Sequence, residues 1–155
     1  MILNLQDNEK RQIFTPYPVC KLMSEVTLGH LEKQIKEKGF VTINDCCCGA
    51  GATLIAAANT AKTQLKDVRL NFQNHILFAA QDIDETVALM CYIQLSLLGV
   101  AAYIKVGDSL SDPIRDGDST ENYWFTPMYF SDVWQYRRIF RRMDEIIEKG
   151  TGMDG

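Results

Sequence analysis

The fold is decided by residues 40–51, Phe40-Val41-Thr42-Ile43-Asn44-Asp45-Cys46-Cys47-Cys48-Gly49-Ala50-Gly51. Residues 40–45 are apolar or β-branched, as in a buried strand. A turn with two glycines follows, and residues 52–61 are rich in alanine, which favours a helix that can pack closely on a sheet. The stretch therefore predicts a strand, a glycine turn and a helix, the repeating unit of a parallel sheet.

Two more strands continue this rhythm along the chain. An apolar strand is predicted at residues 76–82 and another at 101–106, with an apolar helix between them at residues 85–98. Residues 62–74 and 111–122 are polar and predict loops. The alternation predicts an α/β fold, namely a truncated, Rossmann-like, doubly wound and mostly parallel sheet in a single domain over residues 1–150.

The segments before and after the predicted sheet are predicted to be mainly helical. Residues 1–38 predict an N-terminal helical segment in which one helix begins after Thr15 as its N-cap and stops at Gly39. Residues 123–149 predict an aromatic segment without strands and a terminal amphipathic helix, with Trp124, Trp134 and Tyr136 as core residues. Residues 151–155 are expected to be a disordered tail. The apolar face of the terminal helix is formed by Val133, Tyr136, Phe140, Met143 and Ile147. Its basic face, which is expected to be solvated, is formed by Arg137, Arg138, Arg141 and Arg142.

Composition excludes several classes of protein. With 155 residues, 46% of them hydrophobic, and a net charge of −4, the chain resembles a globular domain and not a stand-alone DNA clamp. We find neither a signal peptide nor a membrane span and expect a cytoplasmic protein. The five cysteines are expected to be reduced thiols. A metal site is not expected, because adjacent cysteines do not easily face one ion and both histidines are distant in sequence.

The ends of the three predicted strands carry the residues that suggest a ligand. Ligands of open parallel sheets bind beyond the carboxyl ends of the strands, where the strand order reverses. Gly49 and Gly51 follow the first strand, Asp82 ends the second and Asp108 follows the third. Each has a plain alternative, since glycines form tight turns, Asp82 or the neighbouring Asp84 can cap the next helix, and Asp108 can serve a turn or a cap. Together they predict a pocket in which Asp82 accepts ribose hydroxyls and Asp108 an adenine amino group.

The spacing of these residues favours one adenosyl cofactor over another. The turn lacks the third glycine of a dinucleotide fingerprint, and Asp82 lies farther from it than that fingerprint requires. A nicotinamide cofactor, and with it an oxidoreductase, is therefore disfavoured. S-adenosylmethionine has no pyrophosphate and fits better.

Four segments together resemble a known family, the adenine-specific DNA methyltransferases of type I restriction and modification. The segments are Phe14-Thr15-Pro16, Asp45-Cys46-Cys47-Cys48-Gly49-Ala50-Gly51, Gln81-Asp82-Ile83-Asp84 and Gly107-Asp108-Ser109-Leu110. They resemble the family's F-x-T-P, D-P-x-C-G-x-G, second acidic and G-D-S/T-L motifs, in the family's order. Cys46 stands where the family has proline and makes the turn less rigid.

The resemblance implies S-adenosyl-L-methionine as cofactor and assigns its site. Thr15 and Pro16 would lie near the methionine part, Asp45 and the glycines near its amino acid group, Asp82 at the ribose and Asp108 at the adenine. The full set of implied cofactor residues is Phe14, Thr15, Pro16, Asp45, Cys46, Cys48, Gly49, Gly51, Asp82, Ile83, Asp108 and Ser109.

The family's catalytic N-P-P-F/Y segment has no clear counterpart. The nearest fragment is Asn122-Tyr123-Trp124-Phe125, which keeps Asn and Phe at the family's spacing. In one interpretation Asn122 polarises the target amino group and Phe125 stacks on a flipped base. In the other, which we favour, these aromatic residues close the core or meet a partner.

Two hypotheses for function follow. The first is a DNA adenine methyltransferase-like domain that binds S-adenosylmethionine and, if active, methylates the exocyclic amino group of adenine. The second is an inactive binding protein of the same fold, of mobile-element or phage type, that acts on a restriction-modification or other defence complex. The expected partners are DNA reached through a partner subunit, and a protein partner or a second copy.

Overall fold

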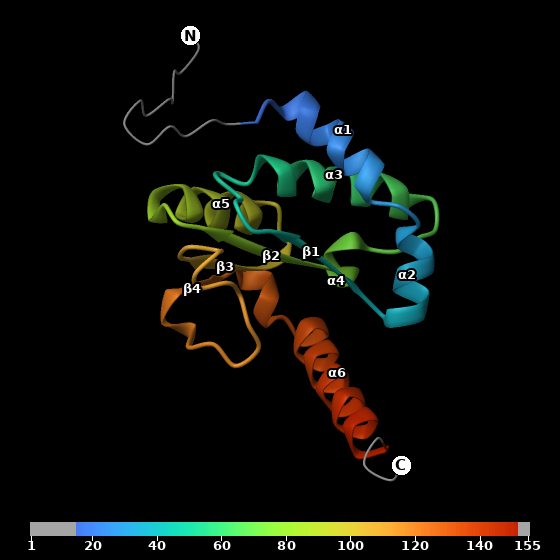
Figure 1. Cartoon of the computed structure of the whole chain (residues 1–155). Helices are drawn as coiled ribbons and strands as arrows, with labels where there is room; N and C mark the ends of the chain where they lie inside the picture. The colour runs from blue at the N-terminus through green and yellow to red at the C-terminus, as the bar shows by residue number, and fades with distance from the viewer. Residues whose placement is uncertain (1–14, 152–155) are drawn as a thin grey trace.

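The computed structural model describes residues 15–151 and contains one mixed sheet (Figure 1). Its strands lie in the order β1-β2-β3-β4, with β1 to β3 parallel and β4 antiparallel to β3. Their bounds are β1 (Val41–Asp45), β2 (Ile76–Asp82), β3 (Ala101–Val106) and β4 (Tyr123–Phe125). The predicted mostly parallel α/β sheet, a truncated Rossmann-like fold, is thereby confirmed.

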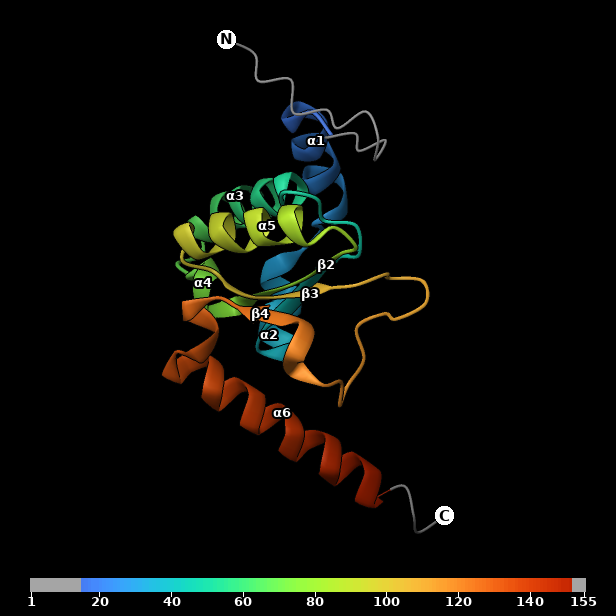
Figure 2. The ribbon, with the colours of Figure 1, turned by 90° about the vertical axis from the view of Figure 1, so that its left-hand side faces the viewer.

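Helices flank this sheet on both sides. Helices α3 (Ala52–Lys66) and α5 (Glu85–Leu97) lie on one face, and α6 (Asp132–Thr151) lies on the other (Figure 2). Helix α1 (Tyr17–Thr27) packs on the outside of α3, where the Asn59 amide donates a hydrogen bond to the Tyr17 hydroxyl. Of these, α3 and α5 connect consecutive parallel strands, because the chain must return to the end of the sheet where the preceding strand began.

Two expectations about the sheet were wrong. Residues 123–125 form a strand, whose register pairs Phe125 with Tyr103, although no strand was expected after residue 106. Aromatic residues are common in strands, but a segment of three residues is too short to show the alternation of apolar and polar side chains that reveals a strand in a sequence. The strand order was also expected to reverse within the sheet. Among the described residues it runs β1-β2-β3-β4 without a reversal, and β1 lies at one edge.

The N-terminal segment contains two helices where one was expected. Helix α1 ends at Thr27, and α2 (Leu31–Lys38) begins after a break that contains Gly29. Pro16, and not Thr15, is the N-cap of α1 and makes no side-chain cap hydrogen bond. Proline fixes its own φ and favours a helix start, which explains the one-residue shift. Gly39 ends α2 as expected.

The polar stretch after the glycine-turn helix is also more ordered than expected. Helix α3 continues to Lys66, five residues beyond the predicted end, and α4 (Phe72–His75) forms a single turn. The Asn71 side chain caps α4 by accepting a hydrogen bond from the Gln73 amide. Short helical turns η1 (Thr120–Asn122) and η2 (Pro127–Phe130) flank β4.

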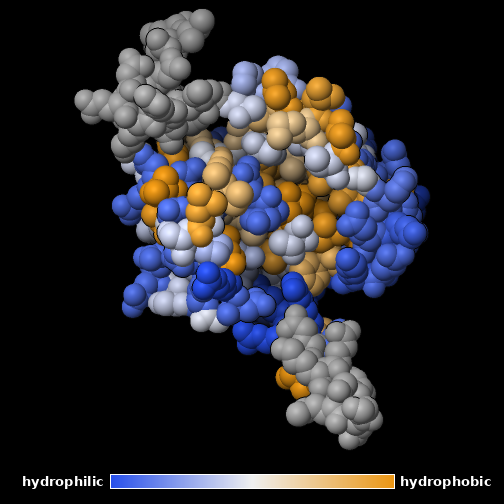
Figure 3. Space-filling model, viewed as in Figure 1, coloured by the Kyte–Doolittle hydropathy of each residue, from blue (hydrophilic) through white to orange (hydrophobic). Residues whose placement is uncertain are grey.

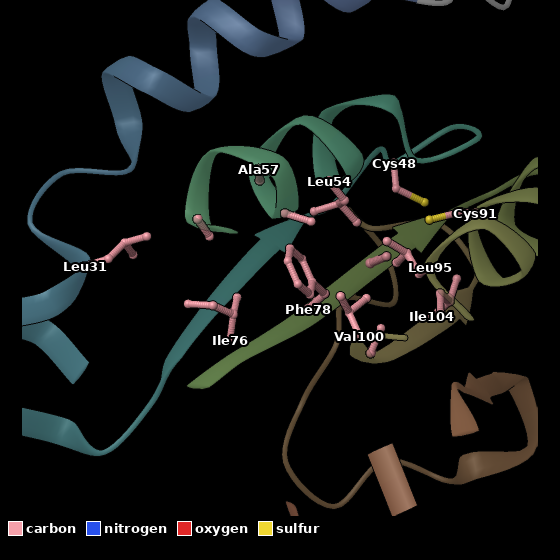
Figure 4. Packing of buried hydrophobic residues seen from close by; sticks show 14 of the residues in the cluster. Leu31, Cys48, Leu54, Ala57, Ile76, Phe78, Cys91, Leu95, Val100 and Ile104 are labelled. Atoms are coloured by element: carbon pink, nitrogen blue, oxygen red, sulfur yellow. The ribbon is translucent and has the colours of Figure 1, made fainter. Parts of the chain in front are cut away.

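The main core lies between the sheet and the helices α3 and α5 (Figure 4). Ile43, Phe78 and Ala102 occupy matched positions on the three parallel strands and face this core. Five alanines of α3 and α5 are buried, which lets the helix backbones approach the strands. Figure 4 shows the sulfurs of Cys48 and Cys91 pointing toward each other within this layer.

A smaller core covers the other face of the sheet. Trp134 is fully buried there against Leu77 and Ala101, and its ring meets Phe40 edge to face at 5.4 Å between centroids. The prediction of Trp134 as a core residue is confirmed. Trp124 is 42% exposed and lies against Tyr92 of α5, so its core assignment was wrong.

Helix α6 differs from the expected amphipathic helix in three ways. It extends to Thr151, one residue into the expected tail. Its arginine side is not simply solvated, because Arg137 donates a hydrogen bond to the Gly39 carbonyl. Its apolar side is exposed, so the core assignment of Tyr136, which is 62% accessible, was wrong. Among the described residues, none of the helices is both long and apolar enough to span a bilayer.

Candidate cofactor site at the strand ends

The glycine turn between β1 and α3 is built by backbone hydrogen bonds to the neighbouring strand. The Cys48 amide donates to the Gln81 carbonyl of β2, and the Gly51 amide donates to the Cys48 carbonyl. Gly49 has a φ of +50°, and a side chain there would meet nothing within 4 Å. Gly51 has a φ of +89° and lies against Cys91, leaving no room for a Cβ. Gly49 therefore presents open backbone, whereas Gly51 permits close packing.

Asp82 joins the end of β2 to this turn. One carboxylate oxygen, Oδ2, accepts a hydrogen bond of 2.8 Å from the Gly49 amide. The other, Oδ1, accepts one of 3.0 Å from the Asp84 amide. The neighbouring Asp84 is the cap of α5, accepting from the Thr86 and Val87 amides. Of the two acids that could cap this helix, Asp82 and Asp84, it is thus Asp84 that does so.

Asp108 follows β3 and lies in a turn of its own. Its Oδ1 accepts a hydrogen bond of 2.9 Å from the Leu110 amide. That bond and further ones from Ser111 lower the pKa of Asp108, so its carboxylate is ionised at neutral pH. The Gly107 amide donates to the Asp82 carbonyl, which ties the ends of β2 and β3 together. The turn role expected as an alternative is present.

Both carboxylates line one open hollow of about 960 Å³. The hollow also contains apolar side chains at its rim, since Ile83 is 71% exposed and Leu110 is 92% exposed. Its walls come from the ends of β1, β2 and β3. They are formed by Cys46, Cys47, Asp82, Ile83, Asp84, Glu85, Thr86, Asp108, Ser109 and Leu110.

A second hollow of about 600 Å³ adjoins the first at Cys47, which lines both. It lies between β1 and α1 and contains Thr15 and Asp45, two more of the predicted site residues. The Asp45 Oδ1 accepts a hydrogen bond of 3.1 Å from the Cys47 amide. The predicted cofactor residues are thus distributed over two adjacent spaces that meet at the glycine turn.

Other predicted cofactor residues lie apart from both hollows. Cys48 is buried in the core, where a hydrogen bond with Cys91 and burial raise the pKa of its thiol. Pro16 caps α1, and Gly49 and Gly51 form the turn between β1 and α3 without lining either hollow. Phe14 lies outside the described residues.

Cys47 is an exposed thiol at the junction of the two hollows. Its sulfur lies 4.0 Å from the Ser109 hydroxyl across the mouth. The Ser109 hydrogen bond favours the thiolate, but burial and the neighbouring Cys46 outweigh it and raise the pKa of Cys47. The thiol is therefore neutral at physiological pH. No cluster of three or more metal-ligating side chains occurs within residues 15–151.

The two predicted catalytic residues do not line either hollow. Asn122 ends the short turn η1 just before β4. Phe125 packs among aromatic rings on the far face of the sheet, 4.8 Å from Tyr129 between centroids. Their assigned roles in catalysis remain predictions.

Sequence reasoning missed a buried lysine beside the site. Lys105 of β3 is 3% exposed, and its Nζ donates to Asp112 at 2.9 Å and to Asp118 at 2.7 Å. The Tyr123 hydroxyl also donates to Asp118, at 2.7 Å. The Gln81 amide reaches the same loop at the Asp112 carbonyl. These bonds hold the loop after Asp108 against β2, β3 and β4.

The ion pairs of this network shift the pKa values of its members. The Lys105 ammonium and the Tyr123 hydroxyl lower the pKa of Asp118 to about 2. The pKa of Lys105 is raised by Asp118 and by Asp112, although desolvation opposes the shift. The sequence signal for this network is a lysine within an otherwise uncharged strand, but the loop that follows contains four aspartates, and the sequence does not show which of them pair with the lysine.

Comparisons with known proteins identify the family of the chain. The family model for the N-6 DNA methylases matches residues 3–150. A modification subunit of a putative type I restriction enzyme from Vibrio vulnificus YJ016 has a similar crystal structure, with a TM-score of 0.49 and 21% sequence identity. That match covers 70% of this chain and 20% of the subunit, so the chain spans a small part of its length. No curated protein matches. The chain belongs to the N-6 DNA methylase family, the adenine methyltransferases.

Proposed function

We propose that the chain binds S-adenosyl-L-methionine across the two hollows at the ends of β1, β2 and β3. The observation that carries this proposal is the meeting of the Asp82 and Asp108 carboxylates, from neighbouring strands, in one open space beside the glycine turn. An adenosyl group needs acceptors for its ribose hydroxyls and its amino group at opposite ends, together with apolar contact for the purine.

Asp82 and Asp108 suit the adenosyl part of this ligand. Each oxygen of Asp82 accepts one backbone hydrogen bond and retains a second lone pair for a ribose hydroxyl. Asp108 is held ionised by its turn and would accept the adenine amino group. The exposed side chains of Ile83 and Leu110 would contact the purine faces. These four residues supply both the polar and the apolar requirements.

The second hollow suits the methionine part. The ligand carries an ammonium group, which the Asp45 carboxylate would pair with, and Thr15 lies in the same space. Gly49 has no side chain to cover the backbone of the glycine turn, so the methionine part of the ligand can lie close to that backbone. When bound, the sulfonium of this ligand supplies an activated methyl group.

Titration calorimetry with S-adenosylmethionine tests the proposal. The unchanged chain is expected to bind, and Asp82→Ala is expected to raise Kd at least about tenfold through the lost charge-assisted hydrogen bonds. Asp67→Asn, at an exposed helix end far from the site, is the control and should bind normally. Circular dichroism on each variant separates loss of binding from loss of folding. Equal affinity of Asp82→Ala and the unchanged chain would contradict the proposal.

We further propose that the methyl group of the bound cofactor is transferred to the exocyclic amino group of adenine in DNA, and that Asn122 polarises this amino group. The net charge of −4 gives the chain no general attraction to DNA, so contact would depend on a partner subunit. Transfer of tritiated methyl groups to DNA, in the presence of candidate partner subunits, tests this step. Incorporation that is lost in Asn122→Ala supports it.

A second candidate function is that of an inactive binding protein with the same fold. The placement of Asn122 and Phe125 outside both hollows favours it, as does the packing of Phe125 among Tyr103, Tyr129 and Phe130. Such a protein would bind the cofactor and engage a restriction-modification or other defence complex. It would transfer no label to any DNA, and Asn122→Ala would leave its cofactor affinity unchanged.

A further inference from the structure

The apolar stripe of α6 is exposed along its whole described length. Six large side chains lie within one arc of the helix, each three or four residues from at least one other, and every one is at least 38% exposed. They are Val133, Tyr136, Ile139, Phe140, Met143 and Ile146. A contiguous apolar surface of this kind on an otherwise charged helix marks an interaction site.

Contacts made by the opposite side of α6 hold the helix so that the stripe faces away from the domain. Trp134 is buried under the sheet, and its indole donates a hydrogen bond to the Gln73 carbonyl. Arg137 donates to the Gly39 carbonyl at 2.7 Å, and the Arg138 guanidinium stacks 4.0 Å from the centre of the Tyr129 ring. Because the polar side holds the helix to its own domain, rotating the stripe inward would break all three contacts.

The far part of α6 extends away from the sheet. Figures 1 and 2 show the helix leaving the lower face of the domain, so its outer half is accessible to another chain. Figure 3 shows hydrophobic atoms at the surface near its lower end. The steps of three and four residues from Val133 through Tyr136 and Phe140 to Met143 are those of a coiled-coil seam.

The charges of α6 indicate which partner fits this seam. Residues 137–142 contain four arginines, whereas residues 144–148 contain three acids and no basic residue. Two copies of α6 in antiparallel orientation would place the basic half of each beside the acidic half of the other. A parallel pair would place like charges together, which is unfavourable.

We propose that α6 pairs with α6 of a second copy of the chain, antiparallel, through this apolar stripe. The symmetric pair would use the same surface on both copies, as in most homodimers. The proposal is independent of cofactor binding, because no residue of the stripe lines the hollows at the strand ends.

Sedimentation of the whole chain at micromolar concentration tests the pairing. The unchanged chain is expected to be a dimer, and Phe140→Glu is expected to raise the dimer Kd about a hundredfold, because it buries an unpaired charge in the seam. Leu22→Glu is the matched control, since Leu22 on α1 is also 61% exposed and also apolar. It should leave the dimer intact.

Three outcomes would overturn the proposal: a monomeric unchanged chain, a dimer unaffected by Phe140→Glu, or a dimer that Leu22→Glu dissociates. The last would place the interface on α1. Met143→Glu provides a second variant should Phe140→Glu fail to fold, as judged by circular dichroism.

Cysteine cross-linking tests the orientation. In the antiparallel pair Tyr136 of one copy lies near Ile146 of the other, so a mixture of Tyr136→Cys and Ile146→Cys chains should form a disulfide-linked dimer under oxidation. In a parallel pair those positions are about 15 Å apart along the helix, and Tyr136→Cys alone should cross-link instead. The unchanged chain, which has exposed Cys46 and Cys47, gives the background.

Discussion

At the scale of single residues, Gly49 and Gly51 perform different tasks within one turn. Both have positive φ, which costs other residues about 1–2 kcal/mol. Only Gly51 also lies against a neighbour, because an added Cβ would be 2.8 Å from the Cys91 sulfur. Gly49 borders open space and donates its amide to Asp82. One glycine is required for packing, and the other leaves the site accessible.

This difference predicts unequal effects of the same substitution. Gly51→Ala is expected to lower the free energy of unfolding by about 2–4 kcal/mol, through backbone strain and overpacking together. Gly49→Ala is expected to cost about 1 kcal/mol and to weaken binding of S-adenosylmethionine by narrowing the passage between the hollows. Urea denaturation measures the first effect and calorimetry the second. Equal destabilisation by both substitutions would contradict this account of the turn.

Asp118 predicts a dependence of stability on pH. Its pKa of about 2 in the folded state lies below that of an aspartate in an unfolded chain, about 4. The ionised carboxylate therefore stabilises the fold above pH 4, and that contribution is lost as the pH falls toward 2. Asp118→Asn should be less stable than the unchanged chain at pH 7, and the difference should shrink over this acidic range. A difference in unfolding free energy that stays constant down to pH 2 would contradict it.

At the scale of elements, hydrogen bonds from a threonine side chain extend the pairing of β3 and β4. The Thr126 hydroxyl is fully buried, donates to the Val100 carbonyl at 2.7 Å and accepts from the Ala102 amide at 2.9 Å. It follows directly after β4, where strand pairing stops. The three-residue strand β4 is thereby held to β3 beyond its own ladder.

Removing this hydroxyl predicts a large loss of stability. Thr126→Val keeps the shape of the side chain but leaves a buried carbonyl and a buried amide without their partner, at a cost of about 2–4 kcal/mol. Thr126→Ser keeps the hydroxyl and is expected to cost about 1 kcal/mol for one methyl group. Thermal unfolding monitored by circular dichroism compares the two. A serine variant as unstable as the valine variant would show that packing, not hydrogen bonding, makes the join.

The elements differed in how well the sequence predicted them. Strands β2 and β3 have the predicted bounds, because continuous apolar runs between turn residues leave little choice. Strand β4 has three residues, and its pairing depends on Tyr103 and Lys105, which are distant in sequence. The split between α1 and α2 was missed because the apolar spacing continues through the break. Local patterns determine long elements, but short ones depend on tertiary partners.

At the scale of the whole molecule, the candidate site was more predictable than the residues that hold it. Parallel topology alone brings the ends of β2 and β3 together, which is why Asp82 and Asp108 could be expected in one place. The Lys105 network depends on how a long loop folds back, which no local pattern specifies. The outward stripe of α6 was likewise not foreseen, because a sequence shows an amphipathic helix but not which side faces its own domain.

The arrangement of the sheet also separates the proposed cofactor site from Phe125, one of the two residues predicted for catalysis. The hollows lie at the carboxyl ends of the parallel strands, while Phe125 packs in an aromatic cluster on the face opposite α3 and α5. Within residues 15–151, β1 remains an edge strand with no neighbour on its outer side. Binding of the cofactor is therefore the property that this part of the chain supports most directly.

A crystal structure of the chain grown with S-adenosylmethionine tests this claim most directly. We expect density for the ribose within hydrogen-bonding distance of Asp82, for the adenine amino group beside Asp108, and for the ammonium group near Asp45. It would be contradicted by crystals in which both hollows remain empty at saturating ligand, or in which the ligand occupies a site that neither Asp82 nor Asp108 touches.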